Sequence, residues 1–244
     1  MKRERACGVN AVDSLIRHAP DRIVRVWVAG GERAQRVAEA ARGHGIAVER
    51  ARPDALGKLS GGVPHQGIVA EFRPRAARSE PELHERVAAA GDDALVLVLD
   101  QVQDPHNLGA CLRSAAAACA TAVVLPRDRA TGLTAAVRRT AAGAAEIVPV
   151  VEVANLARTL RALRDGGVWC TGLAGEAAAT VYEIDFGAPA ALVVGGEAEG
   201  LRRLTRERCD TLARIPISGD VESLNVSVAA AITLFEARRQ RGSA

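Results

Sequence analysis

The segment that decides the fold is Ile215-Pro-Ile-Ser-Gly-Asp-Val-Glu-Ser-Leu-Asn-Val-Ser-Val228. Its beginning continues an apolar stretch, so we expect a strand over residues 212–217. Gly219 and its polar neighbours then turn the chain, and a long final helix is predicted over residues 223–239. Ser223 stands at the start of that helix, where a hydroxyl can cap the first turn. A cap is sufficient to explain Ser223 without any function.

Asn225 is the residue of this segment that capping does not explain. It lies inside the predicted helix beside the apolar Val226 and Val228. A buried amide without hydrogen-bond partners costs roughly 1–3 kcal/mol, so we expect Asn225 to have partners and a purpose.

A second segment, Asp104-Pro-His-Asn-Leu-Gly-Ala-Cys-Leu-Arg113, follows an apolar strand predicted over residues 94–99. Asn107 is expected in the turn, Gly109 at the opening of a helix over residues 109–120, and Arg113 about one turn inside that helix. Side chains placed after such a strand reach the carboxyl edge of a parallel sheet, where ligands of α/β proteins bind. A helix cap at Asn107 and a surface cation at Arg113 remain a plain alternative.

A third segment, Val194-Gly-Gly-Glu-Ala-Glu-Gly-Leu201, ends a strand predicted over residues 190–195. Gly195 and Gly196 remove side chains where another group must come close, and Glu197 places a carboxylate beside them. A turn with the same letters would look similar, so this segment gains weight only together with the other two.

The chain from residue 92 to residue 244 alternates strands and helices. Apolar strands that are buried on both faces and alternate with helices predict an α/β fold with a parallel sheet and right-handed crossovers. The remaining predicted strands are 122–125, 147–151 and 168–172, and the remaining helices are 133–142 and 155–164.

The front of the chain predicts a separate, smaller α/β domain over residues 1–74. It has predicted helices at 9–18 and 32–44 and predicted strands at 22–29, 46–50 and 67–72. Residues 75–91 contain prolines and many charges with little periodicity, and we expect them to form a linker.

Charge is distributed unevenly between these parts. Residues 1–75 carry a net charge of +6, whereas the chain as a whole carries +3. A polyanion that docks mainly on the front domain is one interpretation, and a solvated Arg-rich surface is the other. Aromatic residues make up only 2% of the chain, which argues against RNA recognition by stacking platforms.

Several function classes are disfavoured by what the sequence lacks. It contains neither a GxGxxG nor a GxxxxGK[ST] phosphate-binding loop. Five widely spaced cysteines and the absence of a Cys/His ligand pattern predict free thiols and no metal. No apolar run is long enough to span a membrane, and the first residues do not read as a secretory signal. We therefore expect a cytoplasmic protein.

Taken together, the three segments resemble the motif set of the SpoU (TrmH) family of RNA 2'-O-methyltransferases, over roughly residues 92–240. The resemblance implies a SPOUT-type α/β knot, in which the loop after residue 215 passes through another loop to form a deep trefoil. It implies S-adenosylmethionine (S-adenosyl-L-methionine) as the methyl donor and no metal. The implied donor-binding residues are Gly195, Ile215, Ile217 and Leu224, and the implied catalytic residues are Asn107, Arg113, Glu197, Ser223 and Asn225.

The front domain refines the expected substrate. Gly8-Val-Asn-Ala-Val12 and Val63-Pro-His-Gln-Gly-Ile-Val-Ala70 resemble the RNA-binding domain of the RlmB-type subfamily. That resemblance implies 23S rRNA or its assembly precursor as the partner and a guanosine of the peptidyl-transferase P-site loop as the target. The alternatives are methylation of a tRNA, methylation of an adenosine in 23S rRNA that confers antibiotic resistance, and a non-catalytic RNA-binding assembly factor.

Two further hypotheses concern assembly and mechanism. The final helix carries more apolar residues than one buried face requires, and the resembling family pairs through this region, so we expect a homodimer. Arg113 is a poor general base, because a guanidinium has a pKa above about 12 and no acceptor site. Our hypothesis is that it clamps the phosphate next to the target ribose.

Overall fold

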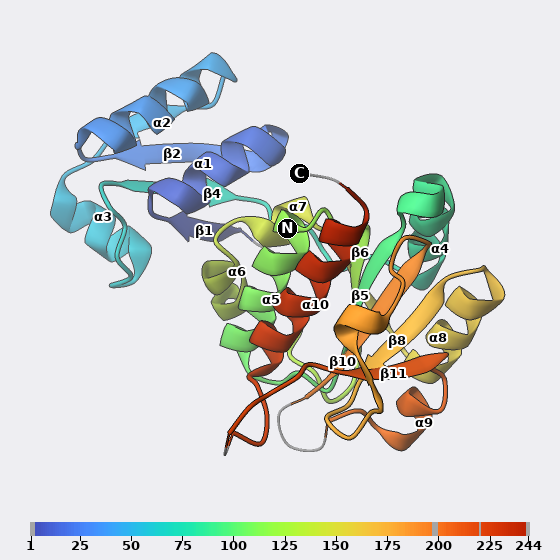
Figure 1. Cartoon of the computed structure of the whole chain (residues 1–244). Helices are drawn as coiled ribbons and strands as arrows, with labels where there is room; N and C mark the ends of the chain where they lie inside the picture. The colour runs from blue at the N-terminus through green and yellow to red at the C-terminus, as the bar shows by residue number, and fades with distance from the viewer. Residues whose placement is uncertain (1–2, 197–199, 220, 243–244) are drawn as a thin grey trace. The chain divides into compact units, whose positions relative to one another are not determined.

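The computed structural model describes residues 3–196, 200–219 and 221–242. The chain folds into two compact units (Figure 1). The first unit consists of Met1–Ala76 together with Ala135–Ile147, and the second consists of Ala77–Thr134 and Val148–Ala244.

The first unit is built on a four-stranded sheet. Its strand order is β1-β4-β2-β3, with β4 antiparallel to both β1 and β2, and β3 parallel to β2. Helices α1 and α2 contribute buried Val12, Ile16 and Ala38, which pack with the strand residues Val26 and Ile68 in one core. The elements are β1 (Glu4–Cys7), α1 (Val9–His18), β2 (Ile23–Val28), α2 (Glu32–Gly43), β3 (Val48–Arg50), α3 (Pro53–Ser60) and β4 (Ile68–Phe72).

Two short helices from the middle of the chain, α6 (Ala135–Ala141) and α7 (Ala144–Ile147), complete the first unit. Arg138 of α6 is nearly buried and forms ion pairs with Glu146 and with Glu4, the latter at 3.3 Å. Gly143 (φ +94°) approaches α1 so closely that a Cβ there would lie 2.3 Å from the Oγ of Ser14. The first unit therefore includes residues that the sequence analysis assigned to the second domain.

The second unit is a parallel sheet covered by helices on both faces. Its seven strands have the order β7-β6-β5-β10-β8-β11-β9, and every pairing is parallel. The predicted parallel α/β architecture is confirmed. The strands are β5 (Leu95–Asp100), β6 (Ala122–Pro126), β7 (Val150–Val153), β8 (Trp169–Leu173), β9 (Ala179–Thr180), β10 (Ala190–Gly195) and β11 (Thr211–Arg214).

The helices lie in two layers. Helices α5 (Pro105–Ala117) and α10 (Val226–Gln240) pack side by side over one face of the sheet (Figure 1). Leucines of α4 (Glu80–Ala90) and α8 (Leu156–Asp165) join a core with Val96 and Val98 of β5 and Val193 of β10. Because side chains of a strand alternate between faces, Leu95, Leu97 and Leu99 of β5 are buried on the other face. Both faces of β5 are thus apolar, as a doubly covered strand requires.

Several predicted boundaries were wrong, each for a local reason. Helix α4 forms within the stretch predicted as linker, where Ser79 and Glu82 make a reciprocal capping box. Helix α5 begins at Pro105 rather than at residue 109, because the Oδ1 of Asp104 accepts a hydrogen bond from the backbone N–H of His106 at 2.8 Å. Helix α10 begins at Val226, with Asn225 as its cap instead of Ser223. The strands β1 and β9 and the helix α3 were not predicted.

Candidate active site

A cavity of about 580 Å³ opens at the carboxyl edge of the parallel sheet, within the second unit. We call it the donor cavity, because the four residues predicted to bind the methyl donor line it. Its walls come from the ends of β8, β10 and β11 and from the first turn of α10. It is lined by Leu173, Ala174, Gly175, Val194, Gly195, Gly196, Gly200, Ala213, Arg214, Ile215, Ile217, Glu222, Ser223, Leu224, Asn225, Val226 and Ala229.

The donor cavity brings together residues that the sequence analysis singled out separately. All four predicted donor-binding residues line it, together with two of the predicted catalytic residues, Ser223 and Asn225. Strand β11 ends before Ile215, so Ile215 and Ile217 lie in the loop that forms the wall. Pro216 has no backbone N–H and cannot extend the ladder of hydrogen bonds between strands. This explains why the observed strand ends earlier than the predicted one.

The glycines of the cavity are explained by contact between backbones. A Cβ on Gly195 would lie 2.0 Å from the carbonyl carbon of Gly200, and one on Gly196 would lie 2.5 Å from the carbonyl oxygen of Gln101. The backbone N–H of Gly200 donates to the carbonyl of Gly196 at 3.1 Å. A side chain at Gly195 or Gly196 would require this backbone to move.

Two asparagines from distant motifs meet at the rim of the donor cavity. The Nδ2 of Asn225 donates to the Oδ1 of Asn107 at 2.9 Å. The Oδ1 of Asn225 in turn accepts from the backbone N–H of Ser227 at 2.8 Å and from its hydroxyl at 2.7 Å. Asn107 is 9% exposed and lies in the first turn of α5. Asn225 is exposed at the N-cap of α10, so the expectation of a buried amide inside the helix was wrong, although its side chain does have a partner in Asn107.

Arg113 stands apart from this pair. It lies on α5, six residues after Asn107, and its side chain is exposed. Within the described part of the chain, no ion pair or hydrogen bond holds its guanidinium. The structure therefore does not bring Arg113 into direct contact with the other predicted catalytic residues. Glu197, the remaining member of that set, lies outside the described residues.

One partly buried ion pair beside the site was missed by the sequence analysis. Asp100, the last residue of β5, is fully buried, and its carboxylate accepts from the Nε of Arg202 at 2.7 Å and from the backbone N–H of Arg202 at 3.0 Å. In the sheet Asp100 lies opposite Gly195. An Asp that ends an otherwise apolar strand was the available signal, but its partner is 102 residues away in the sequence.

Other chemistries find little support near the sheet. Burial raises the pKa of the Cys170 and Cys209 thiols to about 12, so neither thiol is a ready nucleophile at neutral pH. Among residues 3–196, 200–219 and 221–242, no group of three or more His, Cys, Asp or Glu side chains is placed to hold a metal ion. The described helices are also too short or too polar to cross a membrane.

The sequence matches two family profiles. Residues 94–235 match the SpoU rRNA Methylase family, and residues 5–77 match the profile described as RNA 2'-O ribose methyltransferase substrate binding. A similar curated relative is the 23S rRNA (guanosine-2'-O-)-methyltransferase RlmB of Xylella fastidiosa, which is 53% identical over 98% of each chain. The enzyme of the same name from Pseudomonas aeruginosa is 48% identical over 98% of this chain and 97% of its own.

Solved structures give the same result. The SpoU methyltransferase AviRb from Streptomyces viridochromogenes, in complex with the cofactor AdoMet, superposes with a TM-score of 0.77 at 25% identity, covering 99% of this chain and 91% of that one. An AdoMet-bound rRNA methyltransferase from Sinorhizobium meliloti superposes with a TM-score of 0.75 at 26% identity, covering 97% of this chain and 87% of its own.

Proposed function

Because the chain belongs to the SpoU rRNA methylase family, we propose that it transfers the methyl group of S-adenosylmethionine to the 2'-hydroxyl of a guanosine ribose in 23S rRNA. The observation that carries this proposal is the donor cavity, where residues of separate motifs line a single space. The guanosine and the 23S rRNA are those of relatives named 23S rRNA (guanosine-2'-O-)-methyltransferase that are 45–54% identical over nearly their whole length.

The residues of the donor cavity fit S-adenosylmethionine. The cavity combines apolar walls at Ile215, Ile217 and Leu224 with a backbone that Gly195 leaves free of side chains. Apolar walls with a few polar groups are typical of sites for nucleoside-containing ligands. When bound, the donor supplies an electrophilic sulfonium methyl group, and these four residues would hold it.

The asparagine pair would position the attacking ribose. Asn225 has its Oδ1 engaged by Ser227 and its Nδ2 engaged by Asn107, so both amides are fixed in orientation before any substrate binds. A fixed polar group lowers the cost of ordering the reactants, and well-oriented reactants can gain several orders of magnitude in rate. Ser223 lies on the same wall and presents a hydroxyl. We assign Asn107, Ser223 and Asn225 to orienting the 2'-hydroxyl.

Arg113 would act on the RNA rather than on the donor. Its guanidinium is exposed and is not held by another described residue, so its charge is available to a phosphate. A guanidinium binds phosphate oxygens in a bidentate manner but cannot accept a proton at neutral pH. We therefore assign Arg113 to clamping the phosphate next to the target ribose, with the proton lost late or to that phosphate.

The first unit is proposed as the main RNA anchor. Residues 1–75 carry a net charge of +6, and residues 5–77 match a substrate-binding profile. Release of counterions from RNA favours binding by such a surface and makes it sensitive to salt. The domain boundaries at residues 74 and 92 are kept as a proposal with one change, since Ala135–Ile147 is compact with the first unit.

Three finer statements belong to the same proposal. The target lies in the peptidyl-transferase P-site loop, the enzyme works in the cytoplasm, and the active form is a homodimer. Val228 and Phe235 of α10 are seven residues apart on the same helix face and are 46% and 48% exposed. Exposed apolar side chains in register along a helix favour a protein partner, and a second copy of this chain would bury them.

The proposal is tested by mapping the methylated nucleotide. The full-length protein is incubated with unmodified 23S rRNA and S-adenosylmethionine, and stops of reverse transcriptase at low dNTP concentration locate 2'-O-methylation. A single new stop at a guanosine, dependent on both protein and donor, is expected. A stop at an adenosine, or methylation of tRNA alone, would show that the protein acts on a different substrate from the one proposed. Binding of RNA without any methyl transfer would indicate a non-catalytic factor.

A further inference from the structure

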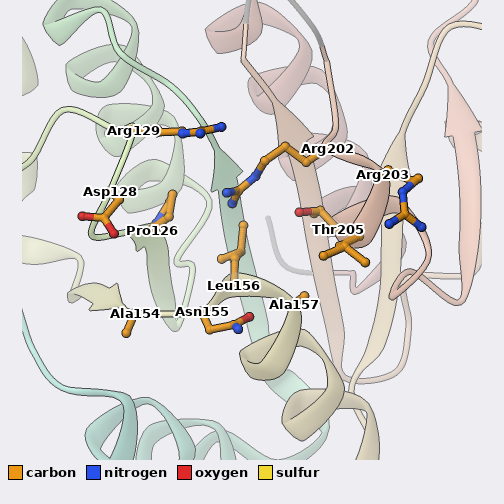
Figure 2. Close-up of a pocket in the computed structure, with 11 residues that line it drawn as sticks. Pro126, Asp128, Arg129, Ala154, Asn155, Leu156, Ala157, Arg202, Arg203 and Thr205 are labelled. Carbon is orange, nitrogen blue, oxygen red and sulfur yellow. The ribbon is translucent and has the colours of Figure 1, made fainter.

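A second cavity, of about 510 Å³, opens at the same edge of the sheet. It lies beyond the ends of β6 and β7, and its other walls are the first turn of α8 and the segment around α9 (Arg203–Arg206). We call it the arginine pocket (Figure 2). Its lining contains three cations, Arg129, Arg202 and Arg203, and the acidic Asp128. None of these residues was singled out from the sequence.

The arginine pocket is a neighbour of the donor cavity. Gly200 lines the donor cavity, and Arg202, two residues later, lines the arginine pocket. Asp100, which holds Arg202, lies opposite Gly195 in the sheet, and Gly195 also lines the donor cavity. The two cavities are therefore linked by residues that are neighbours in the chain and in the sheet, and one polymeric substrate can extend from one to the other.

Arg202 is held in place before any ligand binds. Its Nε and one terminal nitrogen both contact the Oδ1 of Asp100 at 2.7 Å. A guanidinium has five N–H donors, so this contact leaves others free to face the pocket. The Arg202 side chain is 33% exposed, whereas that of Asp100 is fully buried. Arg202 is thus a preformed hydrogen-bond donor. The part of its guanidinium that does not contact Asp100 faces solvent.

Arg129 supplies the uncompensated charge. It is exposed, and no described carboxylate pairs with it. Figure 2 shows the guanidinium of Arg129 pointing toward that of Arg202, while the carboxylate of Asp128 points away from both. Arg203 turns aside and pairs with Glu207 at 2.6 Å. Two guanidinium groups that face the same space repel each other unless an anion lies between them.

The floor of the arginine pocket adds weaker hydrogen-bond donors. Asn155 caps α8 by accepting from the backbone N–H of Arg158 at 3.0 Å. The N–H groups of Leu156 and Ala157 in the same turn have no partner within the helix, as at any helix start. The positive end of the α8 dipole therefore supports an anion that the two arginines would bind.

We propose that the arginine pocket binds a phosphodiester of the RNA substrate, one or a few nucleotides away from the methylated guanosine. This inference rests on the proposed function and goes beyond it by assigning Arg129 and Arg202 to substrate binding. The paired guanidinium groups match the planar, bidentate geometry that phosphate favours. Arg113 and the arginine pocket would then hold the RNA backbone at two places.

The test compares Arg129→Ala with Arg127→Ala in the full-length protein. Arg127 belongs to the same loop, is exposed and carries the same charge, but it does not line the arginine pocket. We expect Arg129→Ala to raise KM for 23S rRNA about tenfold, the effect of one charge-assisted hydrogen bond. The slope of log(kcat/KM) against log[KCl] should become shallower by about 1. Arg129→Lys should restore the slope more than KM, because an ammonium keeps the charge without the fork.

Two readouts separate the possible failures. If Arg129→Ala and Arg127→Ala give the same KM and the same slope, the arginine pocket does not bind the RNA backbone. A rise in the Kd for S-adenosylmethionine in Arg129→Ala would equally overturn the proposal, because the pocket would then serve the donor. If the wild-type protein methylates no guanosine, the proposed function fails. The pocket is then tested by the fluorescence anisotropy of the same labelled rRNA transcript, where Arg129→Ala must still weaken binding more than Arg127→Ala.

Discussion

The rim of the donor cavity and the arginines around it are built in opposite ways. At the rim, Asn107 and Asn225 hold each other, and Gly195 is pressed against the backbone of Gly200. Arg113 and Arg129, by contrast, are exposed and pair with no described carboxylate. Under the proposed function, the chain alone shapes the donor cavity, whereas the exposed arginines gain their counter-charges only when RNA binds.

The largest effect is expected from Arg113→Ala. If Arg113 contacts RNA only in the reacting complex, its loss should lower kcat by roughly 10³-fold, the magnitude typical of a lost transition-state contact. The Kd for S-adenosylmethionine and the unfolding temperature should stay close to wild type. Single-turnover methylation and calorimetry measure the two quantities. Arg113→Lys should be intermediate, and a normal rate in Arg113→Ala would reduce this residue to a surface cation.

Gly195→Ala should instead impair binding of S-adenosylmethionine. The added Cβ would lie 2.0 Å from the carbonyl carbon of Gly200, so the wall of the donor cavity must shift. We expect the affinity for S-adenosylmethionine to fall by about 100-fold, or about 2.7 kcal/mol, because the displaced wall no longer fits the donor. Gly175→Ala is the matched control, because Gly175 lines the same cavity with no atom within 4 Å of its added Cβ. Equal affinities in the two variants would refute the steric argument.

Removing part of the positive charge of the first unit should weaken RNA binding and leave donor binding unchanged. Arg42, Arg50 and Arg52 are exposed and form no ion pair with a described residue. Replacing all three with Ala should make the salt dependence of rRNA binding shallower by up to about 3, if each neutralises one phosphate. Donor affinity should not change. Substitution is preferable to deleting residues 1–76, because deletion would strip Arg138 and Glu146 of their surroundings. An unchanged salt slope would show that the first unit is not the RNA anchor.

Asn225→Ala should lower the free energy of unfolding modestly, but by more than the loss of a helix cap alone. Losing a helix cap costs about 1 kcal/mol, and losing the hydrogen bond from Asn225 to the Oδ1 of Asn107 adds a further cost of about 1 kcal/mol. Asn155→Ala is the control, because Asn155 caps α8 with no amide partner on its side chain. Denaturant unfolding measures both variants. Equal losses would mean that the contact between Asn225 and Asn107 contributes nothing to the folded state.

The sequence predicted which residues line the donor cavity better than it predicted which residues make up each unit. Gly195, Ile215, Ile217 and Leu224 were chosen because the resemblance to the SpoU family implies donor binding at these positions, and the structure places all four around one cavity. Helix starts were misplaced where a cap lies earlier or later than the pattern, at Asp104 and Asn225.

Long-range pairing accounts for what could not be predicted. Arg138 of α6 pairs with Glu4 of β1, and Gly143 fits against Ser14 of α1, so Ala135–Ile147 belongs with the first unit although its neighbours in sequence do not. The pair of Asp100 and Arg202 is of the same kind. Such contacts depend on tertiary structure that no local pattern encodes.

The most direct test of the comparison is calorimetric titration of S-adenosylmethionine into the full-length protein without RNA. If the chain alone shapes the donor cavity, the titration shows saturable binding of one donor per chain, and Arg113→Ala gives the same Kd as wild type. Absence of binding until rRNA is added would contradict a preformed donor site. A weaker Kd in Arg113→Ala would contradict the separation of donor binding from the RNA-facing arginines.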